Sequence, residues 1–96
     1  MNRTLIFVLA LVGTLAASAV GALAECFVDY KAKKDGPLQL HYGIMRLSDA
    51  ECASPNGSGA RRIAVDDWTL LTVMGRLSAA EAQEKKVDAG AYFLRY

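Results

Sequence analysis

The chain has 96 residues, 53% of them hydrophobic, and a formal net charge of +1, so it is too short for more than one domain. Arg3 is the only charged residue among the first 24, which leaves residues 25–96 with equal numbers of basic and acidic side chains. A neutral balance gives no long-range attraction for nucleic acid, so no nucleic-acid partner is expected. Large apolar residues recur throughout residues 25–96, which excludes a disordered chain.

The N-terminal segment has the parts of a cleavable secretory signal peptide. Arg3 precedes a long apolar run, and a stretch of small residues ends at Ala24. Because signal peptidase requires small side chains just before the cut, we predict cleavage of residues 1–24 between Ala24 and Glu25. The single domain of residues 25–96 is then expected in the periplasm or outside the cell. On this interpretation the chain contacts the membrane only during export.

Two alternatives remain open for the same segment. A lipoprotein signal would end at Cys26, but it requires a small residue at the position that Glu25 occupies. An uncleaved anchor is the second alternative, because residues 5–24 are long enough to span a bilayer. The protein would then be a membrane-anchored envelope protein.

The two cysteines, Cys26 and Cys52, predict an intramolecular disulfide, as an even count does in an exported chain. A domain this small buries too little surface to be very stable by itself. Closing a loop of 26 residues stabilises by about 3.5 kcal/mol when the effect is treated as chain entropy. Two free thiols and pairing between chains are the alternatives. The sequence has no Cys-x-x-Cys motif, so it does not indicate a redox function.

Residues 27–47 have the pattern of a β-hairpin. Apolar residues alternate with polar ones over 27–34, and again over 38–47 after the turn formed by Asp35-Gly36-Pro37. The predicted buried face consists of Val28, Tyr30, Ala32, Leu38, Leu40, Tyr42 and Ile44. His41 falls on the polar side of the second strand and is expected to be exposed.

The next segments predict short helices and a strand. Ser48-Asp49-Ala50-Glu51 has the spacing of a capping box for one helical turn, and residues 54–59 are expected to form a polar loop. A main helix is expected from Ser58 or Gly59 to Val65, with Ile63 against the sheet. Residues 68–74 have apolar side chains at both odd and even positions, which is typical of a central strand covered on both faces.

The last third of the chain predicts a second capping box and a final strand. Ser78-Ala79-Ala80-Glu81 precedes either a short exposed helix or a long polar loop over 79–87, and residues 91–96 are expected to form a strand. Together these elements predict an α+β fold. One small antiparallel sheet of about four strands would carry one main helix on one face, with one disulfide, after the N-terminal signal helix.

Three short segments, Tyr30-Lys31, 64–71 and Tyr92-Phe93-Leu94-Arg95, resemble a family of small domains of unknown function. Its members pair an early Tyr-Lys strand with a helix that ends in a segment containing Trp, and finish on a Phe-x-x-Arg-like strand. Asp67 stands here where the family has glycine before the tryptophan. The resemblance implies a β-α-β-β layout and no activity.

No pattern predicts a catalytic residue, a metal or a cofactor. His41, the only histidine, could join Cys26 and Cys52 as a zinc ligand, but a disulfide accounts better for the cysteines. Asp66 and Asp67 could supply acid–base chemistry, although adjacent carboxylates more often end a helix and stay solvated. A small ligand-binding protein or enzyme with a polar site near His41 and Asp66/Asp67 is therefore an alternative function.

The last strand suggests the leading function. Tyr92, Leu94 and Tyr96 would share one face of it. At a sheet edge, such a strand could pair with another protein; alternatively, these side chains complete the core. We therefore expect a non-enzymatic protein-binding or accessory domain that uses a sheet edge or face.

Overall fold

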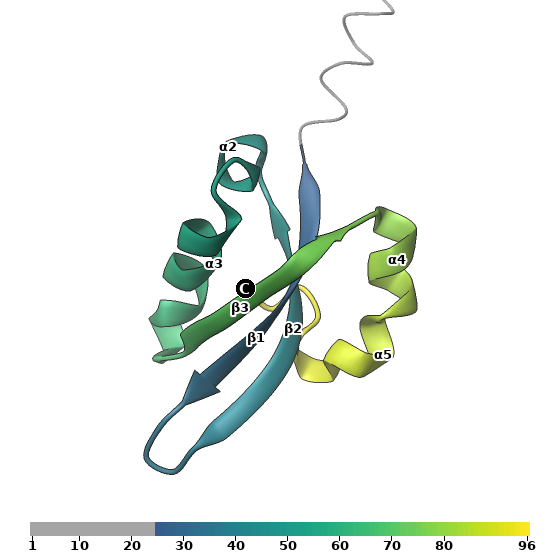
Figure 1. The fold of residues 1–96 in the computed structure, drawn as a ribbon. Helices are drawn as coiled ribbons and strands as arrows, with labels where there is room; N and C mark the ends of the chain where they lie inside the picture. The colour runs from purple at the N-terminus through teal and green to yellow at the C-terminus, as the bar shows by residue number, and fades with distance from the viewer. Residues whose placement is uncertain (1–24) are drawn as a thin grey trace, which may run out of the picture.

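The computed structural model describes residues 25–96, so the predicted signal peptide, its helix and Ala24 lie outside the described residues. Three antiparallel strands form one sheet in the order β2-β1-β3 (Figure 1). The strands are β1 (Cys26–Lys34), β2 (Gln39–Leu47) and β3 (Thr69–Leu77). The helices are α2 (Asp49–Cys52), α3 (Pro55–Ile63), α4 (Ala79–Glu84) and α5 (Lys86–Ala89), with 3₁₀ turns η1 (Ala64–Asp66) and η2 (Gly90–Tyr92). The α+β class is confirmed.

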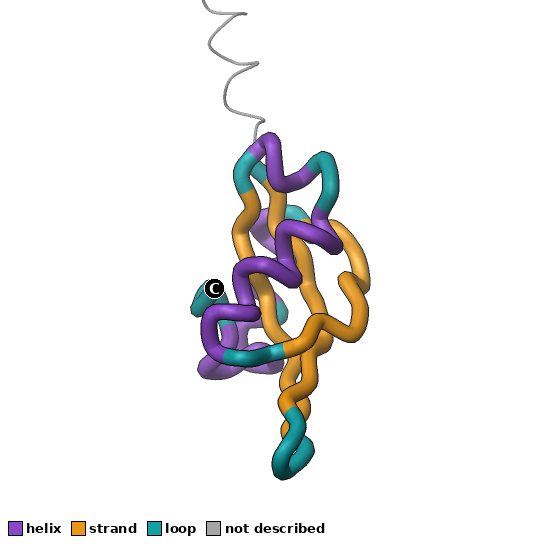
Figure 2. Tube along the Cα trace, turned by 90° about the vertical axis from the view of Figure 1, so that its left-hand side faces the viewer, coloured by secondary structure: helices purple, strands orange, loops and turns teal. Residues whose placement is uncertain are grey.

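Helices cover both faces of the sheet. In Figure 1, α3 lies on one side of the strands while α4 and α5 lie on the other. Figures 1 and 2 both show the β1–β2 turn extending beyond the helices. The expectation of one main helix on one face is therefore wrong. The second helical layer can pack closely because its buried side chains, Ala82 and Ala89, are small.

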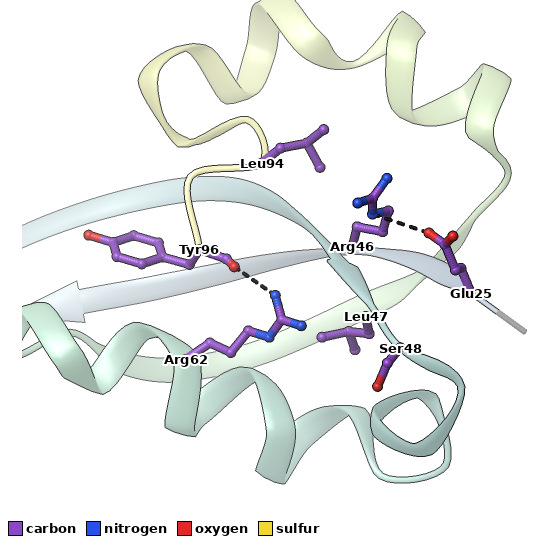
Figure 3. A pocket seen from close by; sticks show the side chains of 7 residues that line it. All are labelled: Glu25, Arg46, Leu47, Ser48, Arg62, Leu94 and Tyr96. Atoms are coloured by element: carbon purple, nitrogen blue, oxygen red, sulfur yellow. Dashed lines mark hydrogen bonds and ion pairs between the residues drawn. The ribbon is translucent and has the colours of Figure 1, made fainter.

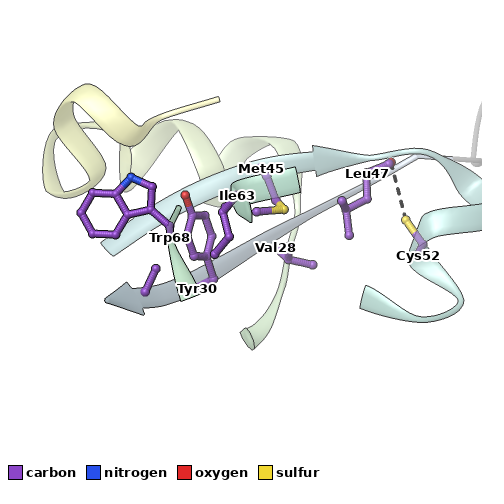
Figure 4. Close-up of a cluster of buried hydrophobic side chains, with 8 residues drawn as sticks. Val28, Tyr30, Met45, Leu47, Cys52, Ile63 and Trp68 are labelled. Atoms are coloured by element: carbon purple, nitrogen blue, oxygen red, sulfur yellow. Dashed lines mark hydrogen bonds between the residues drawn. The ribbon is translucent and has the colours of Figure 1, made fainter. Parts of the chain in front are cut away.

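The main core lies between the sheet and α3 (Figure 4). Val28, Tyr30 and Ala32 of β1 are fully buried there, as the alternation predicts. Ile63 covers them from α3 and is also fully buried, which confirms its predicted contact with the sheet. Each large aliphatic side chain buried in this way stabilises the fold by about 1.5–3 kcal/mol.

A smaller core lies on the opposite face, under α4 and α5. Its buried residues are Ile44, Ala82 and Ala89, and its partly buried ones are Phe27, Tyr42, Leu77 and Phe93. The short helix predicted after Ser78 is confirmed, with Ser78 and Glu81 forming both hydrogen bonds of the capping box. This second core explains why Ile44 is buried although its neighbour Met45 faces α3.

The predicted hairpin is confirmed, with Cys26 paired to Leu47 at one end and Lys34 to Gln39 at the other. Three expectations for the second half of the hairpin are wrong, the first being Leu38, which was expected on the buried face and is 63% exposed in the turn. His41 is buried at 9% exposure, whereas Leu40 is 67% exposed. The cause is tertiary: aromatic side chains cover His41 from one side, while the other face of the sheet is uncovered near the turn.

β3 is an edge strand, and β1 occupies the centre, so the prediction of a central strand over 68–74 is wrong. Leu71 and Met74 are each 51% exposed. The register between β1 and β3 shifts at two bulges, between Asp29 and Tyr30 and between Lys31 and Ala32. A bulge changes the face to which the following side chains point, so apolar residues occur at both parities without double coverage.

The one-turn helix after Ser48 is confirmed, and its capping box with Glu51 forms as predicted. The main helix starts earlier than expected, at Pro55, so most of the predicted polar loop over 54–59 is helical. Proline is well tolerated in the first turn, where its missing N–H has no partner to lose. The helix ends at Ile63, and Asp67 ends the following 3₁₀ turn in a left-handed conformation, with φ of 65°.

Residues 91–96 do not form the predicted fourth strand. The first two of them belong to the 3₁₀ turn η2, and the rest make one isolated parallel bridge, between Phe93 and Ile44. Leu94 has φ of 54°, which interrupts an extended backbone. The sheet of residues 25–96 therefore has three strands.

The Cys26–Cys52 disulfide is confirmed and ties the start of β1 to the end of α2. It leaves no free cysteine among residues 25–96. Because disulfides persist in oxidising environments, this bond indicates a compartment other than the reducing cytosol. In the same part of the chain, no helix is both long enough and apolar enough to cross a membrane.

Candidate functional site

His41 lies at the centre of an aromatic cluster. The other members of this cluster are Tyr30, Trp68, Tyr92 and Tyr96. The His41 ring stacks on Tyr92 with the centroids 3.7 Å apart and the planes 9° from parallel. Trp68 meets the same ring edge-on at 4.2 Å. The His41 Nε2 is 2.9 Å from the Tyr30 hydroxyl oxygen, so the two side chains are hydrogen-bonded.

The cluster keeps His41 neutral. Burial lowers the pKa of His41, and the nearby positive charges of Arg95 and Lys34 lower it further. Its Nδ1 is buried and has no hydrogen-bond partner among the described residues. Burial also raises the pKa of Tyr30, so that hydroxyl stays protonated. The pair can share one hydrogen bond but offers no charged group for chemistry at neutral pH.

The predicted polar site near His41 and Asp66/Asp67 does not assemble. The Asp66 carboxylate accepts a hydrogen bond from the Tyr96 hydroxyl at 2.7 Å, and Asp67 is exposed at the end of η1. The side-chain hydrogen bond of His41 goes to Tyr30, not to a carboxylate. An acid–base pair of His41 with either aspartate is therefore not formed.

Tyr92, Leu94 and Tyr96 do not share the face of a strand, because residues 90–96 cross the edge of β2. We call residues 90–96 the strap. Tyr92 and Tyr96 pack on the α3 side of the sheet, whereas Phe93 packs on the α4/α5 side. The Leu94 amide donates to the Ile44 carbonyl oxygen of β2 at 2.8 Å, so the strap covers this edge.

A groove that the sequence analysis does not predict lies on the uncovered part of the sheet. Its volume is about 300 Å³, and its lining consists of Lys31, Ala32, Leu40, His41, Tyr42 and Leu71. The register pairs Lys31 with Tyr42, so both side chains point to the α4/α5 side of the sheet. We call this cavity the sheet groove. Its exposed Leu40 and Leu71 make it mostly apolar.

Among the described residues, only some of the charged side chains around the sheet groove form ion pairs. Lys31 is exposed and forms no ion pair within residues 25–96, whereas Lys33 pairs with Asp35 at 3.2 Å. At the groove wall, the Tyr42 hydroxyl donates to the buried Asp29 carboxylate at 2.9 Å. Burial and this hydrogen bond raise the pKa of Tyr42 to about 12. The Asp29 carboxylate is also paired with the Lys85 ammonium at 3.5 Å, so the groove presents the cation of Lys31 beside a hydrogen-bonded tyrosine.

A larger pocket of about 540 Å³ lies between the strap and the start of α2 (Figure 3). Two arginines point into it, but both are already paired. Arg46 contacts Glu25 at 3.1 Å, and Arg62 binds the Glu51 carboxylate and the Tyr96 main-chain oxygen. The hydrogen bonds from Arg62 lower the pKa of Glu51 to about 2. These pairings hold α2, α3 and the strap together rather than leaving a free anion site.

One sequence signal could have located the sheet groove. A strand of nine residues is about 30 Å long, whereas a helix over residues 79–87, which would cover the face of the groove, is only about 13 Å long. A helix of this length cannot cover the whole hairpin, so apolar residues near the turn must be exposed. Leu38 and Leu40 are the residues that this comparison would have identified.

Within residues 25–96, no group of three or more His, Cys, Asp or Glu side chains is placed to hold a metal ion. Comparison with known proteins identified no matching family model, no similar curated protein and no similar solved structure.

Proposed function

We propose that the protein is an exported, non-enzymatic protein-binding or accessory domain that holds an extended segment of a partner protein at the sheet groove. The observation that supports this most is the exposed pair Leu40 and Leu71 beside the Lys31 ammonium, on a part of the sheet that no described helix covers. Exposed apolar groups gathered in this way are typical of binding sites.

The geometry also defines the partner's chemistry. The free edge of β3 adjoins the groove through Leu71, and β3 has no strand on its outer side within the described residues. A segment that adds to this edge would form main-chain hydrogen bonds and place alternate side chains beside the groove. We expect an apolar side chain against Leu40 and Leu71, and a carboxylate near Lys31.

The alternative of a ligand-binding protein or enzyme with a site at His41 has less support. The ring of His41 is enclosed by aromatic side chains, and no carboxylate among residues 25–96 is hydrogen-bonded to it. The alternative of a membrane-anchored protein depends on residues 1–24, which lie outside the described residues. It concerns where the domain is held and is compatible with the same groove.

A displayed peptide library tests this proposal even though the partner is unidentified. Selection on the disulfide-bonded protein should enrich extended peptides that combine apolar and acidic residues. Fluorescence anisotropy with an enriched peptide should show at least tenfold weaker binding to Leu40→Asp and Lys31→Glu.

Val87→Asp is the matched control, because Val87 is an apolar residue 90% exposed on α5, outside the groove. This variant should bind the peptide like the unchanged protein. Enrichment of basic peptides, or equal binding by the Leu40→Asp variant, would contradict the proposal.

A further inference from the structure

The strap is held to the edge of β2 by a few separate contacts. One main-chain hydrogen bond joins the Leu94 amide to Ile44, at 2.8 Å. The Arg62 guanidinium donates to the Tyr96 main-chain oxygen at 2.9 Å, and the Tyr96 hydroxyl donates to Asp66 at 2.7 Å. Tyr92, Phe93 and Tyr96 also pack against the two cores. The strap nevertheless pairs with the sheet through one isolated bridge, so it can open without breaking the β1–β2 or β1–β3 pairing.

The strap also encloses His41. Tyr92 of the strap lies flat on the imidazole, with the ring centroids 3.7 Å apart. The imidazole is 9% exposed, and its Nδ1 is buried with no hydrogen-bond partner among the described residues. Detachment of the strap would remove Tyr92 and give water access to this nitrogen. His41 is therefore shielded from protons only while the strap is in place.

We infer that the strap is an acid-released cover of the β2 edge, with His41 as the group whose protonation releases it. A proton on Nδ1 of the enclosed ring would create a buried charge without a partner. The same proton is solvated once the strap has left. Protonation thus favours the detached state, and detachment exposes the Ile44 carbonyl and the rest of the β2 edge.

The charges around His41 act in the same direction. The groups that face it are Tyr30 and Lys34 from β1, Trp68 before β3, and Tyr92, Arg95 and Tyr96 from the strap. Lys34 and Arg95 are the charged ones, and both are positive. The carboxylate of Asp66 accepts a hydrogen bond from the Tyr96 hydroxyl, and no hydrogen bond joins it to the imidazole. Within residues 25–96, no carboxylate is hydrogen-bonded or ion-paired to the imidazole, so an imidazolium would have no direct counter-ion.

The sign of the pH effect follows from the lowered pKa of His41 in the closed state. A free histidine has a pKa of about 6.5, so the closed state loses stability as the pH falls below that value. The loss stops once the pH is below the pKa of the enclosed ring. One linked proton can raise the detached fraction at most about tenfold for each pH unit.

Amide hydrogen exchange of the exported, disulfide-bonded protein measures this opening. The protection factor of the Leu94 amide should fall by up to about tenfold for each pH unit below about 6.5. Amides of the central strand β1 should stay far better protected at the same pH. Trp68, the only tryptophan, gives a second signal, because it meets His41 edge-on and its emission should shift to the red as the strap leaves.

Variants separate the role of His41 from a general loss of stability. His41→Phe keeps an aromatic ring under Tyr92 and cannot be protonated, so Leu94 protection should not change between pH 7.5 and 4.5. Tyr92→Ala should detach the strap throughout this range. If His41→Phe does not fold, Arg95→Gln supplies the test, because it removes one positive charge from the exposed surface.

The Arg95→Gln variant should open at lower pH than the unchanged protein, because losing a positive charge near His41 raises the pKa of the enclosed ring and makes its protonation less costly. Arg61→Gln, which removes an exposed positive charge from α3, should open at the same pH as the unchanged protein. The inference would be overturned if Leu94 protection in the protein without substitutions stayed constant down to pH 4.5. A full pH response in the His41→Phe variant would overturn it as well.

His41 and Tyr42 of β2 also line the sheet groove, but the hydrogen-exchange and peptide-binding tests have separate readouts. Leu40→Asp and Lys31→Glu change the α4/α5 face of the sheet, whereas Tyr92 packs on the α3 face, and Leu94 protection is measured without a peptide.

Discussion

At the scale of single residues, the aromatic cluster depends on a glycine that carries no chemistry. A Cβ atom at Gly43 would lie 2.5 Å from the Tyr30 hydroxyl oxygen and 2.6 Å from the carbon that bears it. The ring of Tyr30 therefore occupies the space of a missing side chain. This position brings the Tyr30 hydroxyl within hydrogen-bonding distance of His41. Glycine is required here because the Tyr30 ring lies too close to the backbone for a Cβ atom, not because the backbone has an unusual angle.

We predict that Gly43→Ala destabilises the protein by about 1–3 kcal/mol, the usual cost of overpacking a core. Thermal unfolding followed by circular dichroism would measure it. Gly75→Ala is the control, because a Cβ there meets nothing within 4 Å. It should leave the midpoint unchanged or raise it slightly, since alanine restricts the unfolded chain. Equal destabilisation by both substitutions would contradict this interpretation of the contact.

At the scale of elements, the short helices depend on their first residues. α4 has six residues, too few for a stable isolated helix, and its Ser78–Glu81 capping box satisfies two free N–H groups. Ser54 precedes α3 in the same position but makes no side-chain cap hydrogen bond. The two serines thus differ in their hydrogen bonds although both stand before a helix.

Ser78→Ala should therefore cost about 1 kcal/mol of stability, or a fall of about 4–8 °C in Tm. Calorimetry of the two serine variants checks this. Ser54→Ala should lie close to the unchanged protein, because no cap bond is lost. The assigned role of the cap fails if both alanines lower Tm equally.

The ion pair between α2 and α3 gives a prediction about acid. The Arg62 hydrogen bonds lower the pKa of Glu51 to about 2 in the folded protein. A lowered acidic pKa stabilises fully above the unfolded value of about 4.3, and the contribution disappears as the pH falls towards 2.

Urea unfolding between pH 5 and 2.5 should therefore show a steeper loss of stability for the unchanged protein than for Glu51→Gln. Glu84→Gln, on exposed α4, is the control and should keep the steep loss. Parallel curves for the unchanged and Glu51→Gln proteins would show that this pair has no effect on acid stability.

At the scale of the whole molecule, stability depends on the disulfide. Residues 25–96 divide their apolar side chains between two small cores on opposite faces of a three-stranded sheet. Neither core is large, and the part of the sheet near the hairpin turn is uncovered. Closing the 26-residue loop between Cys26 and Cys52 compensates by restricting the unfolded chain.

We predict that replacing both cysteines by serine lowers the free energy of unfolding by about 3.5 kcal/mol. Urea titration of this variant beside the unchanged protein, with and without reductant, would measure the difference. Reductant should bring the unchanged protein to the stability of the variant and have no effect on the variant. A variant as stable as the oxidised protein would contradict the role assigned to this bond.

Export is tested by the mass of the mature protein. If residues 1–24 are a cleaved signal peptide, the protein recovered after export begins at Glu25, and its intact mass is two hydrogens lower than that of the reduced form. A retained N-terminal segment would instead support the membrane-anchored alternative. Recovery of the uncleaved chain from the cytosol with both thiols reduced would contradict export.

The local pattern of the sequence was sufficient for features that depend on near neighbours. The hairpin, the buried face of β1, both capping boxes and the disulfide were predicted, because alternation, cap spacing and cysteine count act over short distances or by covalent chemistry. Only the tertiary structure decided which side chains are buried. His41 is buried and Leu40 exposed because helix lengths and the path of the strap, rather than polarity, determine which part of the sheet is covered. β3 is apolar at odd and even positions although it lies at an edge, because two bulges change the direction of its side chains, and residues 91–96 form no strand because Leu94 has a positive φ. Alternation reveals neither feature.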